Sequence, residues 1–392
     1  MATYYVRASG GNDANDGLSF AQGWATIQKA ADTATAGDEV RICADGTHTL
    51  TATVDFDTNA GTVAGRVLFT GANSAGAIDG TRPTITTAST LANGLFDLGA
   101  NIDYLRFASL VLDGGGSGKA ATTLQANVLN AGNHLILEDC RFTNASGNGV
   151  ILGAQTQLAK VSNCRFDNNG KGGSGSGVVG RLADRGVAIF LGCFFDNNAT
   201  HGSGLNAWPL VYTKCSFYRN GADGVNCGSV SENLLLSDCL FYLNGANGLN
   251  LDAASYHPTI LNCSAVSNGV YGFKFNSMNL SAIGLALNNH THGNTSGATD
   301  INGNVLPGTG NVTGDPLFRN TTAGSEDFTP AYNSPLVNAG YPSGDIGAVQ
   351  RPEGYPAIAD VENGTGYGAW TNELVGTLIP DGPKVGSKTG GR

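Results

Sequence analysis

The sequence is poor in charged residues. It has neither a basic segment that would bind a polyanion nor an apolar segment that would enter a membrane. Only 13% of its 392 residues are Asp, Glu, Lys or Arg, and the formal net charge is −10. The Lys and Arg residues are scattered, whereas a nucleic-acid-binding protein needs a basic surface. No apolar run is long enough to span a bilayer, and residues 1–17 lack the basic start and apolar core of an export signal. We therefore expect no nucleic-acid or membrane partner, and folding in a cytoplasm.

What the sequence does contain is a repeat of about two dozen residues. Gly is abundant, with 58 residues, but no three-residue collagen period occurs. Six of the eight Cys residues recur at intervals of 24, 29, 22, 24 and 24, at Cys140, Cys164, Cys193, Cys215, Cys239 and Cys263. Two positions after each Cys stand Phe142, Phe166, Phe195, Phe217, Phe241 and Ala265. Five positions after each Cys from the second onward stand Asn169, Asn198, Asn220, Asn244 and Asn268.

Each repeat predicts three short strands separated by turns, because apolar residues alternate with period two and no helical period appears. Self-similarity of this length indicates a solenoid of stacked strands. We predict an all-β fold, a single-stranded right-handed parallel β-helix with three short strands per coil. Stacking of coils at about 4.8 Å would place the Cys and Phe columns inside and make the Asn column an amide ladder along a turn.

The cysteines allow three interpretations: metal sites, a disulfide framework or small buried thiols. No C-x-x-C occurs and no His lies at a zinc-like spacing. Stacked Cys residues would lie within disulfide range, but their parallel Cα–Cβ vectors fit the disulfide dihedral poorly. We therefore predict reduced, buried thiols, with Cys43 and Cys227 also pointing inward.

Three regions follow from the sequence. Residues 1–45 are expected to cap the solenoid, with Trp24, Ile27, Ala31 and Ala34 on one face of a short helix that Gly37 ends before a strand at Glu39–Ile42. Residues 46–350 form the β-helix, most regular at 135–290. Residues 351–392 form a Pro/Gly-rich tail that we expect to need a partner to become ordered.

Both ends of the repeat region resemble a known group of proteins. The opening "YYVRASGGNDANDGLSFAQGWATIQKAADTATAGDEVRI" is similar to the start of pectate-lyase-like right-handed β-helix repeat proteins. The closing "GDPLF" and "DFTPAYNSPLVNAGYPSGDIGA" resemble the C-terminal part of the same superfamily. The resemblance covers roughly residues 3–350 and implies the fold. It leaves function open, because the superfamily includes polysaccharide lyases, hydrolases, epimerases, adhesins and phage virion proteins.

The first candidate site is an outward-facing strip of amides along one sheet. Alternation places Asn206, Asn226, Asn250 and Lys274 in one column and Trp208, Asp252 and Asn276 in a second. Trp faces stack on sugars and Asn amides bond to hydroxyls, so the strip predicts carbohydrate binding; the alternative is an ordinary solvated β-face. Among lyases of the superfamily, a Lys base works beside calcium-binding carboxylates, and the resemblance puts Lys274 at such a position. Only Asp223 and Asp252 stand nearby as acids, so Ca²⁺ is unsupported and we expect no metal or cofactor.

The second candidate is the column directly after each Phe, which contains Asp167 and Asp196. Neighbouring coils would bring these two carboxylates near the separation found in retaining glycosidases. The alternative is that the longer loops "GKGGSGSG" and "ATHGSG" spread them into solvent. His201, His257, His290 and His292 are expected in loops without matched partners, where "NHTHGN" forms a polar loop or a metal-binding one.

Two functions from different classes remain. The first is a non-enzymatic phage virion structural protein, of capsid-decoration, fibre or tail-adhesin type, that presents a rigid β-helix and binds glycans. Its partners would be other virion proteins or copies of itself, including a homotrimer, and cell-surface polysaccharide. The second is a polysaccharide-degrading enzyme, a lyase or glycoside hydrolase of tailspike type. The expected location is the virion, with the extracellular space as the alternative.

Overall fold

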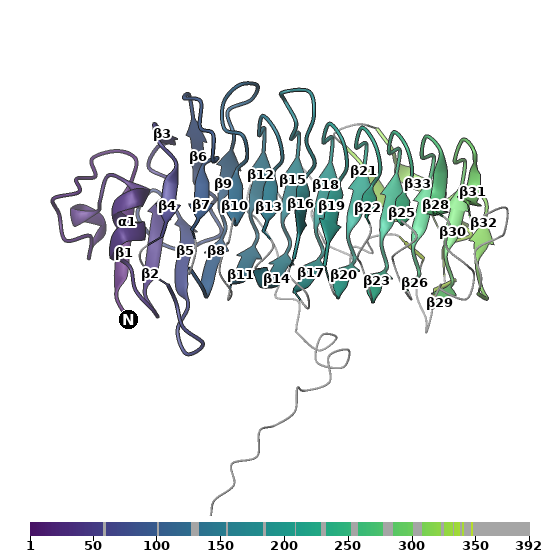
Figure 1. Cartoon of the computed structure of the whole chain (residues 1–392), viewed down its shortest axis with the longest axis horizontal. Helices are drawn as coiled ribbons and strands as arrows, with labels where there is room; N and C mark the ends of the chain where they lie inside the picture. Colours follow the sequence, from purple (N-terminus) through teal and green to yellow (C-terminus); the bar gives the residue numbers. More distant parts are fainter. Residues whose placement is uncertain are drawn as a thin grey trace, which may run out of the picture.

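The computed structural model describes residues 1–347 except positions 58–59, 100–101, 127–132, 154–155, 183–185, 208, 229–232, 252–257, 277–284, 301–307, 323–324, 332, 338 and 341–345. These residues form a parallel β-helix whose coils follow one another in chain order along a single axis (Figure 1). Each regular coil contributes one strand to each of three parallel sheets, as the repeat predicts.

Sheet A has 11 strands and begins at the N-terminus. Its strands are β1 (Thr3–Arg7), β2 (Glu39–Cys43), β5 (Val67–Ala72), β8 (Leu105–Ala108), β11 (Asn133–Glu138), β14 (Thr156–Ser162), β17 (Val187–Leu191), β20 (Leu210–Thr213), β23 (Leu234–Ser237), β26 (Thr259–Leu261) and β29 (Leu285–Leu287).

Sheet B also has 11 strands and carries the Phe column. Its strands are β3 (His48–Leu50), β6 (Thr84–Thr87), β9 (Val111–Asp113), β12 (Arg141–Thr143), β15 (Arg165–Asp167), β18 (Phe194–Asp196), β21 (Ser216–Tyr218), β24 (Leu240–Tyr242), β27 (Ser264–Val266), β30 (His290–His292) and β32 (Val312–Thr313).

Sheet C has 10 strands and carries the predicted amide strip. Its strands are β4 (Val54–Phe56), β7 (Phe96–Leu98), β10 (Leu124–Ala126), β13 (Val150–Leu152), β16 (Val178–Arg181), β19 (Ser203–Asn206), β22 (Val225–Cys227), β25 (Leu249–Leu251), β28 (Tyr271–Phe275) and β31 (Gly297–Asp300).

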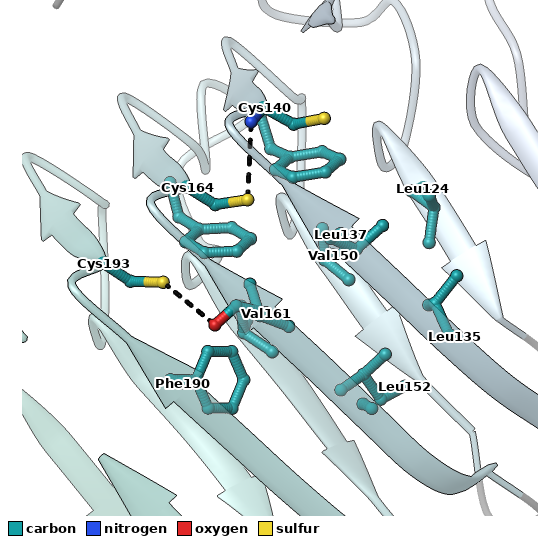
Figure 2. Close-up of a cluster of buried hydrophobic side chains, with 14 of the residues drawn as sticks. Leu124, Leu135, Leu137, Cys140, Val150, Leu152, Val161, Cys164, Phe190 and Cys193 are labelled. Carbon is teal, nitrogen blue, oxygen red and sulfur yellow. Dashed lines mark hydrogen bonds between the residues drawn. The ribbon is translucent and has the colours of Figure 1, made fainter. Parts of the chain in front are cut away.

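The core consists of the predicted columns. The Phe rings stack with centroids 5.1 Å apart between Phe142 and Phe166, and 4.6 Å apart between Phe195 and Phe217. All eight Cys residues are buried free thiols, which agrees with the prediction. Figure 2 shows Cys140, Cys164 and Cys193 in successive coils, beside the aliphatic side chains of the core.

Two sharp turns per coil explain why the Cys and Asn positions recur. The residue before each Cys of the column has a positive φ, as at Asp139, Asn163 and Asp238. The residue before each ladder Asn does too, as at Asn168 and Leu243. Left-handed backbone at a single residue turns the chain through a corner, and Asn and Asp tolerate it best among residues with a side chain.

The ladder Asn residues close these corners. The Asn244 Nδ2 donates to Phe217 O at 3.0 Å and to Asn268 Oδ1 at 2.9 Å, and Asn220 donates to Asn244 in the same way. The side chains are 0–2% exposed along the column. The predicted amide ladder is therefore confirmed.

The N-terminal end is covered by a short helix, α1 (Ile27–Thr33), which contacts β1 and β4 (Figure 1). Trp24 precedes the helix, after the 3₁₀ turn η1 (Phe20–Gln22), and is 2% exposed. The helix ends at Thr33, so the prediction that it continues to Gly37 is wrong; Gly37, with φ of 90°, turns the chain toward β2. No helix in the described part of the chain is long and apolar enough to cross a membrane.

A segment after β32 folds back over the outer face of sheet B. We call the described residues 314–322, 325–331, 333–337, 339–340 and 346–347 the C-terminal strap; it contains the antiparallel pair β33 (Phe318–Asn320) and β34 (Asp327–Pro330). Phe328 packs on Tyr218 and Tyr242, with ring centroids 5.5 and 5.2 Å away. The strap thus covers outward side chains of sheet B with a second, smaller apolar cluster.

Candidate functional site

The amide strip lies on the outer face of sheet C, across β22, β25 and β28. Val225, Leu249 and Phe273 point into the core and are fully buried. The residues between them pair in register, Asn226 beside Asn250 and Asn250 beside Lys274, and all three are half-buried. The structure therefore confirms that these three side chains form one outward column.

Asn206 does not belong to that column, contrary to the prediction. Ser203 pairs with Val225, so Asn206 lies beside Gly228, two positions further along. A Cβ placed at Gly228 would be 3.4 Å from the Asn206 Nδ2, which agrees with this register. The cause is Ser203, which is fully buried and bonds to the Tyr212 hydroxyl at 2.6 Å. The predicted alignment of the coils relied on an apolar residue at each inward position. Here the inward residue is Ser, so the alignment was shifted.

Asn276 lies at the edge of the strip and joins it through a hydrogen bond. Its Nδ2 donates to the Oδ1 of Asn250 at 3.0 Å. The other two members of the predicted second column, Trp208 and Asp252, lie outside the described residues, as does His257.

Two residues outside the predicted columns, Asp223 and His201, fix the orientation of the amides. Asp223, 4% exposed, accepts a hydrogen bond from Asn250 Nδ2 at 3.2 Å on one carboxylate oxygen. The other oxygen accepts from the Asn247 backbone at 2.9 Å and from its amide at 2.7 Å. The His201 ring lies between Asp223 and Asn226, with Nε2 3.2 Å from the Asn226 Nδ2. His201 lies in a loop, as predicted, but the expectation that it has no matched partners is wrong.

The hydrogen bonds of this network stabilise the charged form of Asp223. Burial alone would oppose ionisation, but the hydrogen bonds from His201 and Asn247 lower the pKa of the Asp223 carboxyl. Both of its oxygens already have donors, so the carboxylate orients amides and has little capacity left for a cation.

One polar atom beside the strip, on β19, has no hydrogen-bond partner among the described residues. The Asn206 Oδ1 is buried and accepts no hydrogen bond from the described residues. A buried acceptor without a donor is unfavourable by about 1–3 kcal/mol.

Lys274 is half-buried in the column, beside Asn250 and in register with Asp300 of β31. A Lys that serves as a base in a calcium-dependent lyase needs several carboxylates beside it. Among the described residues no group of three or more His, Cys, Asp or Glu is arranged to hold a metal ion. The arrangement therefore provides a cation that can bond to hydroxyl or acidic groups.

Asp167 and Asp196 are adjacent, as predicted, but they are fully buried on the outer side of sheet B. Arg141 binds Asp167 through two hydrogen bonds of 3.0 and 2.7 Å, and Arg165 binds Asp196 through two of 3.0 Å. The expectation that long loops spread these carboxylates into solvent is wrong. A glycosidase pair needs access to substrate, which two buried, arginine-bound carboxylates do not have.

His290 and His292 lie in strand β30, not in a loop. His290 is fully buried and bonds to Ser264 and to the C-terminal strap. The sequence "NHTHGN" gave no signal of this, because its partners are 24 and 26 residues away in the chain.

Comparisons with known proteins agree with this architecture. A family model described as a right-handed beta helix region matches residues 181–312. The pectate lyase Pel9A has 17% identity and a TM-score of 0.60, covering 87% of this chain and 92% of its own. A rhamnogalacturonan lyase has 16% identity and a TM-score of 0.54, with coverage of 79% and 87%.

A third structure, Geobacillus virus E2 ORF18, has 12% identity and a TM-score of 0.43. The match covers 79% of this chain and 60% of the viral chain. A comparison of the sequence with curated proteins found no match. At these identities the likeness concerns the fold alone. The chain therefore folds as a right-handed parallel β-helix, as these two lyases do.

Proposed function

We propose that this protein binds carbohydrate through the amide strip of sheet C and serves as a non-enzymatic structural component of a phage particle, of decoration, fibre or adhesin type. The observation that carries the proposal is the row of Asn226, Asn250 and Lys274, held at strand spacing on a rigid face. Sugars present hydroxyls as both donors and acceptors, and side-chain amides match both.

Two features of the strip support binding without catalysis. The amides are oriented before any ligand arrives, because Asp223 and Asn276 bond to Asn250, and preorganised groups lose less entropy on binding. The Asp223 carboxylate is already saturated, so it is poorly placed to act as a general base.

The placement in a particle rests on the predicted partners: other virion proteins, copies of this chain and a host-surface polysaccharide. The extracellular space is the alternative location. A polysaccharide-degrading activity is the second candidate function, and the position of Lys274 in the strip is the observation in its favour.

Binding is tested by titrating purified protein with capsular and cell-wall polysaccharides and measuring affinity by calorimetry. Asn226→Ala should weaken binding about two- to tenfold, the size of one hydrogen bond. Thr259→Ala, a half-buried position on the outer face of sheet A, is the matched control and should bind like the unaltered protein. Equal loss in both variants, or no binding to any polysaccharide, would contradict the site.

Catalysis is tested with the same mixtures. New reducing ends or unsaturated uronates, abolished by Lys274→Ala, would replace the binding proposal with the enzymatic one. Mass spectrometry of purified particles tests the structural role; absence of the chain from every particle would contradict it.

A further inference from the structure

His290 joins the solenoid to the C-terminal strap. Its Nδ1 lies 2.8 Å from the Ser264 Oγ on the neighbouring strand β27, and its Nε2 lies 2.7 Å from the carbonyl oxygen of Gly314, the first strap residue. The ring is fully buried. A carbonyl oxygen only accepts hydrogen bonds, so Nε2 carries the proton and Nδ1 accepts from the Ser264 hydroxyl. In this state the imidazole is neutral.

The remaining strap contacts lie further along sheet B. Arg219 forms an ion pair with Glu326, and its Nη2 donates to Thr321 O at 3.0 Å. Phe318 and Phe328 pack on the apolar cluster of Tyr218, Leu240, Tyr242 and Val266. At the end of the strap, Gly347 approaches Ser264 so closely that a Cβ there would lie 2.1 Å from the Ser264 Cβ. The strap therefore closes over both partners of the Ser264–His290 pair.

We propose that Ser264, His290 and the Gly314 carbonyl form a pH-sensitive latch, in which protonation of His290 releases the C-terminal strap and uncovers the outer face of sheet B. A second proton on His290 would place a charge in a site without solvent, and would turn Nδ1 from an acceptor into a donor toward a hydroxyl that now donates to it. Release of the strap returns the ring to water, where the charge is solvated.

The direction of the effect follows from linkage. Burial has the largest effect and lowers the pKa of His290. The Gly314 hydrogen bond raises this pKa by less, His292 lowers it and Asp315 raises it, so the net shift is downward. The released histidine titrates near the ordinary value of about 6.5. The released form therefore binds more protons below that pH, and strap docking is complete above it and weakens as the pH falls.

Among the described residues, the charged or titratable groups that face His290 are His292 of its own strand and Asp315 of the strap. The Arg219–Glu326 pair holds the other end of the strap, and carboxylates titrate at lower pH. Between pH 7.5 and 5.5 the change is thus assigned to His290.

Release would expose a row of large side chains. Leu240 is fully buried, Tyr218 is 1% exposed and Val266 is 2% exposed under the strap. Exposed contiguous apolar patches of this kind mark interaction surfaces. The latch would therefore keep this apolar face of sheet B covered at neutral pH and expose it on acidification.

The test is amide hydrogen exchange of β33 and β34 in the full chain, corrected for the pH dependence of intrinsic exchange. From pH 7.5 to 5.5 the protection of these amides should fall by about tenfold, while amides of β24 in the solenoid keep theirs. His290→Gln should remove the pH step. His292→Gln, the adjacent histidine of the same strand, is the matched control and should keep it.

No pH step in the unaltered protein, a step that survives in His290→Gln, or a step lost in His292→Gln would each overturn the latch. If His290→Gln does not fold, Ser264→Ala provides the second test. It should lower strap protection at pH 7.5, because Nδ1 loses its donor, and unchanged protection would overturn the proposal. These outcomes are independent of whether the amide strip binds carbohydrate.

Discussion

At the scale of single residues, the most regular positions of the sequence serve the fold. Cys239 and Phe241 are fully buried, and Asn244 bonds to the coils on both sides. The residues that differ between coils, such as Asn226, Asn250 and Lys274, point outward. Function in a solenoid is therefore expected in the variable positions between the repeated ones.

Phe217→Ala is expected to lower the free energy of unfolding by about 3–5 kcal/mol. The ring is fully buried between Phe195 at 4.6 Å and Phe241 at 5.2 Å, and two rigid neighbouring coils prevent the cavity from collapsing. Urea denaturation followed by circular dichroism measures the change. A loss below about 1 kcal/mol would mean that the Phe column does not carry the interior packing.

At the scale of elements, sheet B has two different outer regions. Toward the C-terminal end, strands β21, β24 and β27 carry apolar side chains that the strap covers. Toward the N-terminal end, β12, β15 and β18 carry the Arg141–Asp167 and Arg165–Asp196 pairs, which form a ladder of ion pairs with buried carboxylates. Asp167 and Asp196 raise the pKa of Arg165 although burial opposes its charge. We therefore assign these ion pairs a structural role.

Asp196→Ala should destabilise the protein by about 3–5 kcal/mol, because it removes the fully buried carboxylate that accepts two hydrogen bonds from Arg165. The matched control is Glu138→Ala, which breaks the half-exposed Arg106–Glu138 pair on sheet A and should lose less than about 1 kcal/mol. Thermal and chemical denaturation measure both. Similar losses in the two variants would show that burial does not decide the strength of the ladder.

At the scale of the whole molecule, the N-terminal end of the solenoid would promote aggregation if it were uncovered. The edge of a sheet presents unpaired backbone groups that recruit other strands. Here β1 begins sheet A, while Trp24, Ile27 and Ala31 cover the end of the core. The cap thus supports solubility as well as stability.

Removal of residues 2–37 should convert the protein into higher oligomers or aggregates, because β2 and the apolar interior become exposed. Size-exclusion chromatography with light scattering measures the change. Truncation after residue 350 removes only the tail beyond the strap and is the control, which should keep the size of the unaltered chain. A soluble variant of unchanged oligomeric state after removal of the cap would contradict the role of the helix and β1.

The sequence predicted the three-strand coil, the inward columns and the amide ladder because these depend on residues one coil apart. The prediction was wrong where a single residue departed from the repeat pattern. The buried Ser203 shifted Asn206 out of its expected column, and Thr33 ended the cap helix one turn before Gly37. A pattern of apolar residues does not reveal a polar side chain that is buried because a distant hydroxyl bonds to it.

By itself, the sequence determined that this chain is a stacked β-solenoid, since in-register repetition of Cys, Phe and Asn needs no contact beyond the adjacent coil. Only the tertiary structure decided which outward residues are accessible. Asp167 and Asp196 are bound by Arg141 and Arg165 of preceding coils, and His290 is enclosed by a strap that returns from beyond β32. Accessibility depends on long-range packing, which the repeat does not encode, so the amide strip is half-buried while the carboxylate pair is fully buried.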